Sequence, residues 1–463
     1  MTASNQTLQE YSRRIEELAT ELGLDFYPVD FELVPNNFMT EIAVYGLPVR
    51  MPHWSFGVRY IHQLIRQGMG HSRIFEVMFP GDPCHAYLVN DNSLPENTLV
   101  IAHVLGHADF AKNNHLFAHF KEMAGGHILE QAAAHAHRIE SALEEFGQER
   151  VEAVLDAALA LEPHIDTNQQ LHRLRYPVLR PGEEQSKENA QSANNFRLRF
   201  QHLPGEIAPA AEPHGASRAP VPPQPEYDLL WFIANYAPEM EGWERDIFLA
   251  VREESFYFYP VFACQIMNEG WASYWHARLL READFLPHDL YLSAIKAHSD
   301  VVRPYAADNQ LALAVNPYHL GFSIWEHLIG KKGIAAARQI CREEDDFGFI
   351  RNYLDDELAE KLELFVYESD DDGGIKIAGR DIHAIREAIL APKFNYGAPR
   401  IAASRLHIDG SLELVHDHQS DGRGLDVMRA ERVLDYISRV WRRPVSLQTI
   451  GISGNPRVIS SKK

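Results

Sequence analysis

The sequence predicts an α+β protein that is predominantly helical, with a helical core, a β-hairpin near its N-terminal part and a C-terminal ββαββαβ domain. Helical periodicity, with apolar residues at i, i+3, i+4 and i+7, recurs through residues 7–22 and 227–360. After residue 361 it gives way to short alternating segments between Gly and Asp turns, which are typical of strands.

The composition is that of a globular protein with two or three domains. Hydrophobic residues make up 45% of the 463 residues and charged residues 24%. A formal net charge of -21 argues against a dedicated nucleic-acid binder or a polybasic membrane anchor. Three cysteines are too few for a disulfide framework, and we find no secretory segment or membrane span, so the expected location is the cytoplasm.

Changes in composition divide the chain into four parts. We expect a mainly helical region over residues 1–176, a Pro-rich and polar linker or strap over 177–226, a second helical region over 227–360 packed on the first, and an α+β domain over 361–463. The linker is expected because its apolar content is too low to support a core of its own.

Strands are predicted where apolar and polar residues alternate between turn signals. Residues 74–79 and 84–89 flank Pro-Gly-Asp-Pro, which predicts a β-hairpin, whereas residues 26–35 contain two prolines and are expected to be extended or irregular. The strands predicted in the C-terminal domain are 362–367, 375–377, 401–408, 412–415 and 445–450. His416 and His418 follow the fourth of these and, without a third convergent ligand, are expected to be exposed.

His103 and His107 lie four residues apart in an apolar segment that predicts a helix. Their imidazoles would share one helical face, with the spacing that zinc helices of the His-Glu-x-x-His type use to hold a metal ion. Val104 follows His103, so the general base of those helices is missing from its usual place. Asn97 or Thr98 is the expected N-cap.

A second segment, residues 267–276, has a similar polar face in an aromatic setting. Glu269 and His276 fall at i and i+7 among two tryptophans and a tyrosine, where a carboxylate and an imidazole are costly to bury unless they bind something. We expect the two helices to face each other and form a metal-site-like core. In it His103, His107 and Glu269 would bind a divalent metal, and His276 would be a fourth ligand or support the ligands.

Zinc is the metal expected first, and iron or manganese stay open because ligand type alone does not separate them. Glu254 or His276 is the expected catalytic proton acceptor, although Glu254 lies on an earlier helix and would have to fold back. An ion pair with Arg252 is the alternative for Glu254. Asp109 follows His107 closely and could orient its imidazole.

Motifs in order along nearly the whole chain carry a family resemblance. They are LPVRMPHWSFG at 47–57, PCHAYL at 83–88, the two histidines with KNN at 112–114, REE at 252–254, MNEGWASYWH at 267–276, NPY at 316–318 and RRPV at 442–445. The chain resembles the stage V sporulation protein R (SpoVR) family. The resemblance implies a role in spore-cortex formation in sporulating bacteria or in stress physiology elsewhere, with a serine protein kinase and a von Willebrand-type protein as partners. It implies no settled enzymatic activity.

Two functions follow from these residues. The first is a metal-dependent hydrolase, of amide or peptide bonds, in which the metal lowers the pKa of a bound water. The second is a non-enzymatic regulatory or scaffold protein, acting with the kinase system, in which the same histidines and glutamate form a structural polar network.

Overall fold

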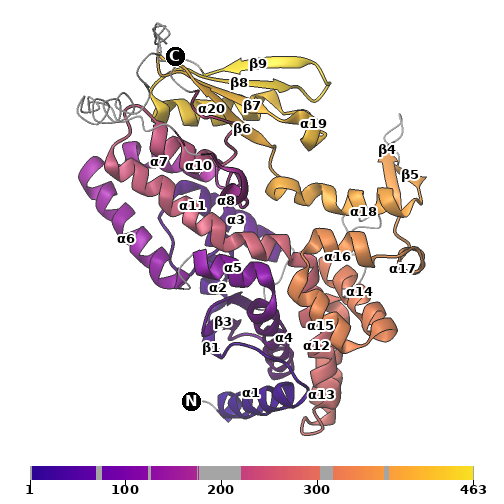
Figure 1. The fold of residues 1–463 in the computed structure, drawn as a ribbon. Helices are drawn as coiled ribbons and strands as arrows, with labels where there is room; N and C mark the ends of the chain where they lie inside the picture. The colour runs from indigo at the N-terminus through magenta and orange to yellow at the C-terminus, as the bar shows by residue number, and fades with distance from the viewer. Residues whose placement is uncertain are drawn as a thin grey trace, which may run out of the picture.

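The computed structural model describes residues 3–68, 76–123, 127–174, 176, 220–302, 316–369 and 375–461. It confirms a predominantly helical α+β fold, whose described residues form three small sheets; the four-stranded sheet lies at the top of Figure 1, beside the C-terminus. Most of the predicted linker, residues 177–219, lies outside the described residues.

Most of the helices lie in segments predicted to be helical. In chain order they are α1 (Ala3–Glu21), α2 (Asn36–Tyr45), α3 (Trp54–Gly68), α4 (Leu94–Asn113), α5 (His115–Met123), α6 (Ile128–Phe146), α7 (Gln148–Ala160), α8 (Gln169–His172), α10 (Leu229–Tyr236), α11 (Gly242–Ala263), α12 (Gln265–Glu282), α13 (His288–Val301), α14 (Pro317–Lys332), α15 (Ile334–Glu343), α16 (Asp346–Tyr353), α17 (Asp356–Lys361), α18 (Ile382–Leu390), the 3₁₀ helix η1 (Ala391–Gly397), α19 (His418–Asp421) and α20 (Val427–Trp441). Among the described residues, no helix is both long enough and apolar enough to cross a bilayer.

The N-terminal sheet contains the predicted hairpin and one strand more. β2 (Glu76–Phe79) pairs antiparallel with β3 (Cys84–Val89), as expected. The segment expected to be extended or irregular forms β1 (Val29–Val34), which pairs parallel with β3. Its two prolines flank the strand instead of interrupting it, so they remove no ladder hydrogen bond.

Residues 361–463 contain the predicted strands and helices in the predicted order. β4 (Val366–Ser369) and β5 (Ile375–Gly379) form a hairpin, and the second sheet has the order β6-β7-β8-β9. Its strands are β6 (Ile401–Leu406), β7 (Leu412–His416), β8 (Val445–Ile450) and β9 (Pro456–Ser460). α20 connects β7 to its parallel neighbour β8, and the unpredicted β9 adds an antiparallel edge.

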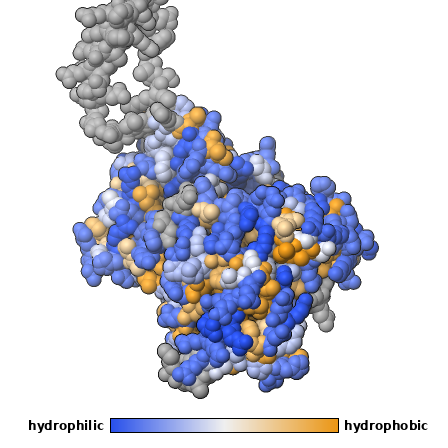
Figure 2. Space-filling view, turned by 60° about the horizontal axis from the view of Figure 1, so that its bottom comes forward, coloured by the Kyte–Doolittle hydropathy of each residue, from blue (hydrophilic) through white to orange (hydrophobic). Residues whose placement is uncertain are grey.

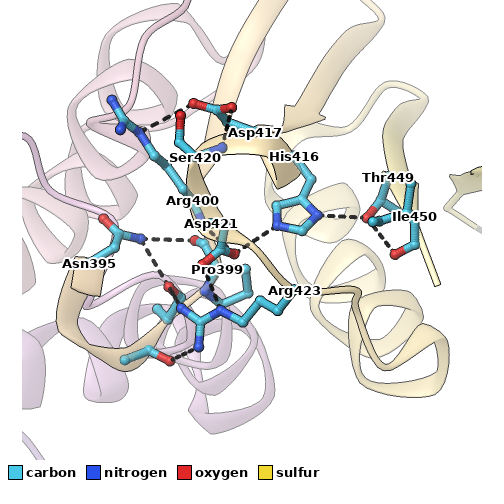
Figure 3. A network of polar contacts seen from close by, with 12 residues as sticks. Asn395, Pro399, Arg400, His416, Asp417, Ser420, Asp421, Arg423, Thr449 and Ile450 are labelled. Carbon is cyan, nitrogen blue, oxygen red and sulfur yellow. Dashed lines mark hydrogen bonds and ion pairs between the residues drawn. The ribbon is translucent and has the colours of Figure 1, made fainter. Parts of the chain in front are cut away.

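The prediction that His416 is exposed is wrong. Its side chain is buried at the end of β7, where Nδ1 lies 2.9 Å from Thr449 Oγ1 and Nε2 lies 2.8 Å from Asp421 Oδ2 (Figure 3). Arg423 donates to the other oxygen of Asp421 at 2.6 Å. The prediction rested on the lack of a third convergent ligand and did not take into account that α19 folds back over the end of the strand.

Two large hydrophobic cores hold the molecule together. One core joins α4, α12 and α14 with parts of α1 and α16, so the two helical regions share an interior. The other joins α7, α10 and α11 to the β6–β9 sheet and α20. Hydrophilic residues predominate on the face shown in Figure 2, with hydrophobic residues scattered among them.

Candidate metal centre

α4 carries the histidine pair through the centre of the molecule. Ser93 caps it, with Glu96 completing a capping box, so the helix begins earlier than an N-cap at Asn97 or Thr98 predicts. Residues 97–111 are all buried, which explains why the segment is apolar all round and not amphipathic. A helix enclosed on every side holds its side chains in fixed positions.

α12 lies directly against α4 (Figure 1), because small residues line the contacts. A Cβ at Gly106 would come within 2.6 Å of Ala272 Cα, and a Cβ at Gly270 within 2.2 Å of the Gly321 carbonyl carbon of α14. The Asp346 carboxylate caps the start of α12 by accepting from two of its backbone N–H groups, each at 2.9 Å. These contacts fix the register of α12 beside α4.

The predicted ligands converge. Oε2 of Glu269 lies 3.5 Å from Nε2 of His103 and 3.5 Å from Nε2 of His107. Ligand atoms of the three residues all lie within 4.8 Å of one another. Two ligands held tetrahedrally about 2.1 Å from a zinc ion are about 3.4 Å apart, so the spacing fits a shared metal ion and is too long for direct hydrogen bonds.

The remaining ring nitrogens are already engaged. Nδ1 of His107 donates to Oδ1 of Asn268 at 2.8 Å, which leaves the lone pair of its Nε2 directed at Glu269. Nδ1 of His103 lies 2.8 Å from Nδ1 of His276. His103 Nε2 and Glu269 Oε2 are buried without a hydrogen-bond partner. This is the arrangement found around protein-bound metals, where the outer nitrogen of each ligand histidine is held by a neighbour.

His276 supports a ligand and is not itself part of the convergent group. Its Nε2 lies 2.5 Å from Nδ1 of His298 on α13, so both of its nitrogens are used. When a cation binds Nε2 of His103, every nitrogen in these contacts has a partner if Nδ1 of His103 donates to Nδ1 of His276 and Nε2 of His276 donates to Nδ1 of His298. His276 therefore orients His103.

Two residues at the site were not predicted from the sequence. Glu76, at the start of β2, places Oε1 3.9 Å from Nε2 of His103. Tyr318 on α14 lies beside Glu269, whose charge raises the pKa of the Tyr318 hydroxyl, and its ring stacks near His103, with ring centroids 6.2 Å apart. A carboxylate within an otherwise apolar strand was the available signal for Glu76, whereas Tyr318 was marked only as the last residue of the NPY motif.

Burial and mutual contact shift the pKa values at the site. Burial, helped by the nearby His107, lowers the pKa of His103 to about 4. Burial, helped by the Glu269 charge, raises the pKa of Glu76 to about 7. Burial also raises the pKa of Glu269, but the two histidines outweigh it and hold that pKa at about 2. The group thus keeps one full negative charge facing two imidazoles, which favours binding of a cation.

Glu254 lies in a different buried cluster. Its carboxylate accepts from Nε of Arg50 at 2.7 Å, and its other oxygen lies 3.6 Å from Nδ1 of His135. Arg50 also pairs with Glu162 at 2.6 Å. The expected ion pair between Glu254 and Arg252 is wrong: Glu254 pairs with Arg50, and Arg252 pairs with Asp228 at 2.7 Å.

Asp109 does not orient His107. It accepts from the indole N–H of Trp271 at 2.8 Å and from the backbone N–H of Asp25 at 2.7 Å. Asn268, beside Glu269 in the sequence, holds His107 instead. Asp109 therefore positions α12 through its tryptophan.

A small cavity of about 50 Å³ borders the convergent group. Its lining residues are Glu76, Glu96, Leu99, Val100, His103, His276, Ala297 and Tyr318. A water molecule fits in this space beside both His103 and Glu76.

These features define a class: a mainly helical α+β protein whose buried His₂Glu group lies between two facing helices. The chain belongs to the SpoVR family, whose model, described as SpoVR like protein, matches residues 2–397. It is 30% identical over 353 residues to YcgB of Escherichia coli (strain K12), which is described as uncharacterized; the alignment covers 74% of this chain and 66% of that protein, just under two thirds. No solved structure matches. The β6–β9 sheet lies beyond the residues that the family model matches.

Proposed function

We propose that this protein binds one divalent metal ion, zinc before iron or manganese, through His103, His107 and Glu269. The observation that carries the proposal is the convergence of two Nε2 atoms on one carboxylate oxygen at 3.5 Å, with two of the three atoms buried and unpartnered. Unpartnered buried polar groups are rare because each costs free energy. A shared cation removes that cost.

We further propose that the metal serves hydrolysis, of an amide or peptide bond. A bound divalent metal would polarise a water and lower its pKa toward neutrality. Glu76 borders the same cavity as His103 and is placed to accept the proton, the role that Glu254 was predicted to have. His276 then acts as a positioning residue, and Tyr318 lies beside Glu269.

Elemental analysis of the purified full-length chain tests the metal site. We expect about one equivalent of metal per chain, retained after gel filtration, and its loss in the His103→Ala, His107→Ala double variant. His137→Ala, at an exposed position of α6, is the control and should keep the metal. A folded wild-type chain that holds no zinc, iron or manganese after exposure to each would contradict the proposal.

A second candidate is a structural metal in a regulatory or scaffold protein. It is favoured by the small cavity, about 50 Å³, and by the close approach of α4 to α12. Glu76→Gln separates the two functions, because Glu76 is not in the convergent group. If hydrolysis is the function, this variant keeps its metal but fails to complement a deletion strain. If the metal is structural, the variant complements fully.

The family resemblance extends the proposal to physiology. We propose a role in spore-cortex formation or stress physiology, in the cytoplasm, together with a serine protein kinase and a von Willebrand-type protein. Membership of the SpoVR family supports it. Co-purification of the tagged full-length chain with these two proteins from its own host tests the partnership, and their absence from the purified material under stress conditions would contradict it.

A further inference from the structure

α3 presents an apolar face to the outside of the protein. Trp54, Val58, Ile61 and Ile65 lie at i, i+4, i+7 and i+11, so they form one line along the helix. Their exposed fractions lie between 46% and 59%, whereas apolar side chains of this size are usually covered in a folded protein. A line of four such residues is a contiguous patch and not a scatter of single side chains.

The opposite face of α3 fixes the helix to the protein. Phe56 is buried and packs edge to face on Tyr45, with ring centroids 5.3 Å apart. At the start of the outward line, the indole N–H of Trp54 donates to Asp156 on α7 at 2.9 Å, while 52% of this side chain stays exposed. The core therefore uses the Phe56 face of α3, and the line from Val58 to Ile65 is a second, outward face.

The charge of this segment is opposite to that of the whole chain. Residues 42–75 contain no Asp or Glu, although the protein has 65 of them and a net charge of -21. The segment contains four arginines, at positions 50, 59, 66 and 73, of which Arg50 is buried in its ion pairs with Glu162 and Glu254. Arg59 occupies an exposed position of α3, about 100° round the helix from Val58, and its guanidinium lies 5.6 Å from the centroid of the Phe56 ring.

We propose that α3 binds the surface of an anionic lipid bilayer. Apolar side chains including a tryptophan on one face and arginines beside them are typical of helices that lie in the membrane interface, with the rings and aliphatic groups among the acyl chains and the guanidinium groups at the phosphates. The negative charge of the rest of the protein does not prevent this, because charges more than about 8 Å away are screened at physiological salt.

A bilayer fits this face better than a second copy of the chain. Two copies paired through α3 would bring two segments without acidic residues together, each with an exposed Arg59, and like charges at close range oppose pairing. A flat anionic surface instead attracts this segment while it covers the apolar line. The attachment is peripheral, through one helix, and does not depend on the metal site.

Vesicle flotation of the full-length protein tests the proposal. We expect binding to vesicles of phosphatidylcholine mixed with phosphatidylglycerol, at least tenfold weaker binding to phosphatidylcholine alone, and weaker binding as salt is raised. Ile61→Ser with Ile65→Ser should reduce binding at least tenfold. Ile408→Ser, at a 97% exposed position in the β6–β7 turn, is the matched apolar control and should bind normally.

A charge variant and its control complete the test. Arg59→Glu should weaken binding, whereas Arg429→Glu, at an exposed position of α20, should not. Circular dichroism and thermal melting verify that each variant is folded. Absence of vesicle binding by the folded wild type overturns the proposal. It is also overturned if the serine variants bind vesicles as well as the wild type does. A wild-type chain that forms a concentration-dependent dimer, lost in the serine variants, and does not bind vesicles would show that α3 pairs with a second copy instead.

Discussion

Glu269→Gln is the sharpest perturbation of the metal site. The amide keeps the size of the carboxylate, removes its charge and adds N–H donors; a side-chain shift of about 0.5 Å would bring them within hydrogen-bond distance of the two Nε2 atoms now 3.5 Å from Oε2. It should therefore abolish the proposed cation site and satisfy the same buried atoms by hydrogen bonding. A metal site and a purely structural polar network respond to this change in opposite ways.

The expected magnitude follows from the two unpartnered atoms, His103 Nε2 and Glu269 Oε2. Each unsatisfied buried group costs about 1–3 kcal/mol, so the metal-free wild type carries about 2–6 kcal/mol that the glutamine variant avoids. Zinc at 100 times its Kd stabilises the wild type by about 2.7 kcal/mol. With about 2.1 cal/mol/K of unfolding entropy per residue over 463 residues, this corresponds to a rise in Tm of about 3 °C.

Differential scanning calorimetry with EDTA or with zinc measures both effects. In EDTA, Glu269→Gln should melt at or above the wild-type Tm. Zinc should raise the Tm of the wild type and leave that of the variant unchanged. Glu282→Gln, at a half-exposed position of the same helix, should behave as wild type. The reasoning is refuted if the wild type ignores zinc while the glutamine variant is strongly destabilised in EDTA.

Three further predictions concern packing, the second buried cluster and pH. Gly270→Ala should lower the free energy of unfolding in urea by about 1–3 kcal/mol and reduce the metal content, because α12 must move away from α14. Gly330→Ala is the control: its Cβ meets nothing within 4 Å, so this variant should raise the free energy of unfolding by about 0.5–1 kcal/mol. Glu254→Gln should lower the free energy of unfolding by about 1–3 kcal/mol, because it removes one of the two carboxylates that pair with the buried Arg50 and leaves Glu162 as the other. The metal stoichiometry should stay unchanged by elemental analysis; loss of metal would contradict the placement of Glu254 outside the site. Burial lowers the pKa of His135, but its two glutamate neighbours outweigh this and raise it to about 9, so its contribution to stability, up to about 3 kcal/mol, is complete below pH 6.5 and is lost as pH rises through 9. Urea titrations should show that decline in the wild type and a flatter profile in His135→Gln.

Local patterns predicted most of the fold. The strands predicted at 84–89 and 445–450 match β3 and β8. Their sequences already favour strand conformation, and pairing with neighbouring strands only strengthens that preference. β1 and β9 were missed. β1 has prolines at both ends and becomes a strand only because β3, far along the chain, lies beside it.

Burial of single residues was less predictable. His416 stands at the end of a short strand, where the sequence gives no sign that α19 returns to cover it. Glu254 stood in an aromatic setting that suggested catalysis, but its nearest cation, Arg50, comes from a loop 204 residues earlier. Ion pairs between distant segments leave no periodic trace in a sequence.

The sequence by itself determined that His103 and His107 share one face of a helix, because their spacing fixes this by helix geometry alone. The tertiary structure decided what surrounds them: Glu269 approaches both imidazoles, Asn268 and His276 contact their Nδ1 atoms, and Glu76 places a carboxylate near His103. The physical reason is that a helix fixes the relative positions of residues within a few turns, whereas the distance between two helices depends on how they pack. Here that packing depends on glycines that let α12 approach α4 and α14 closely.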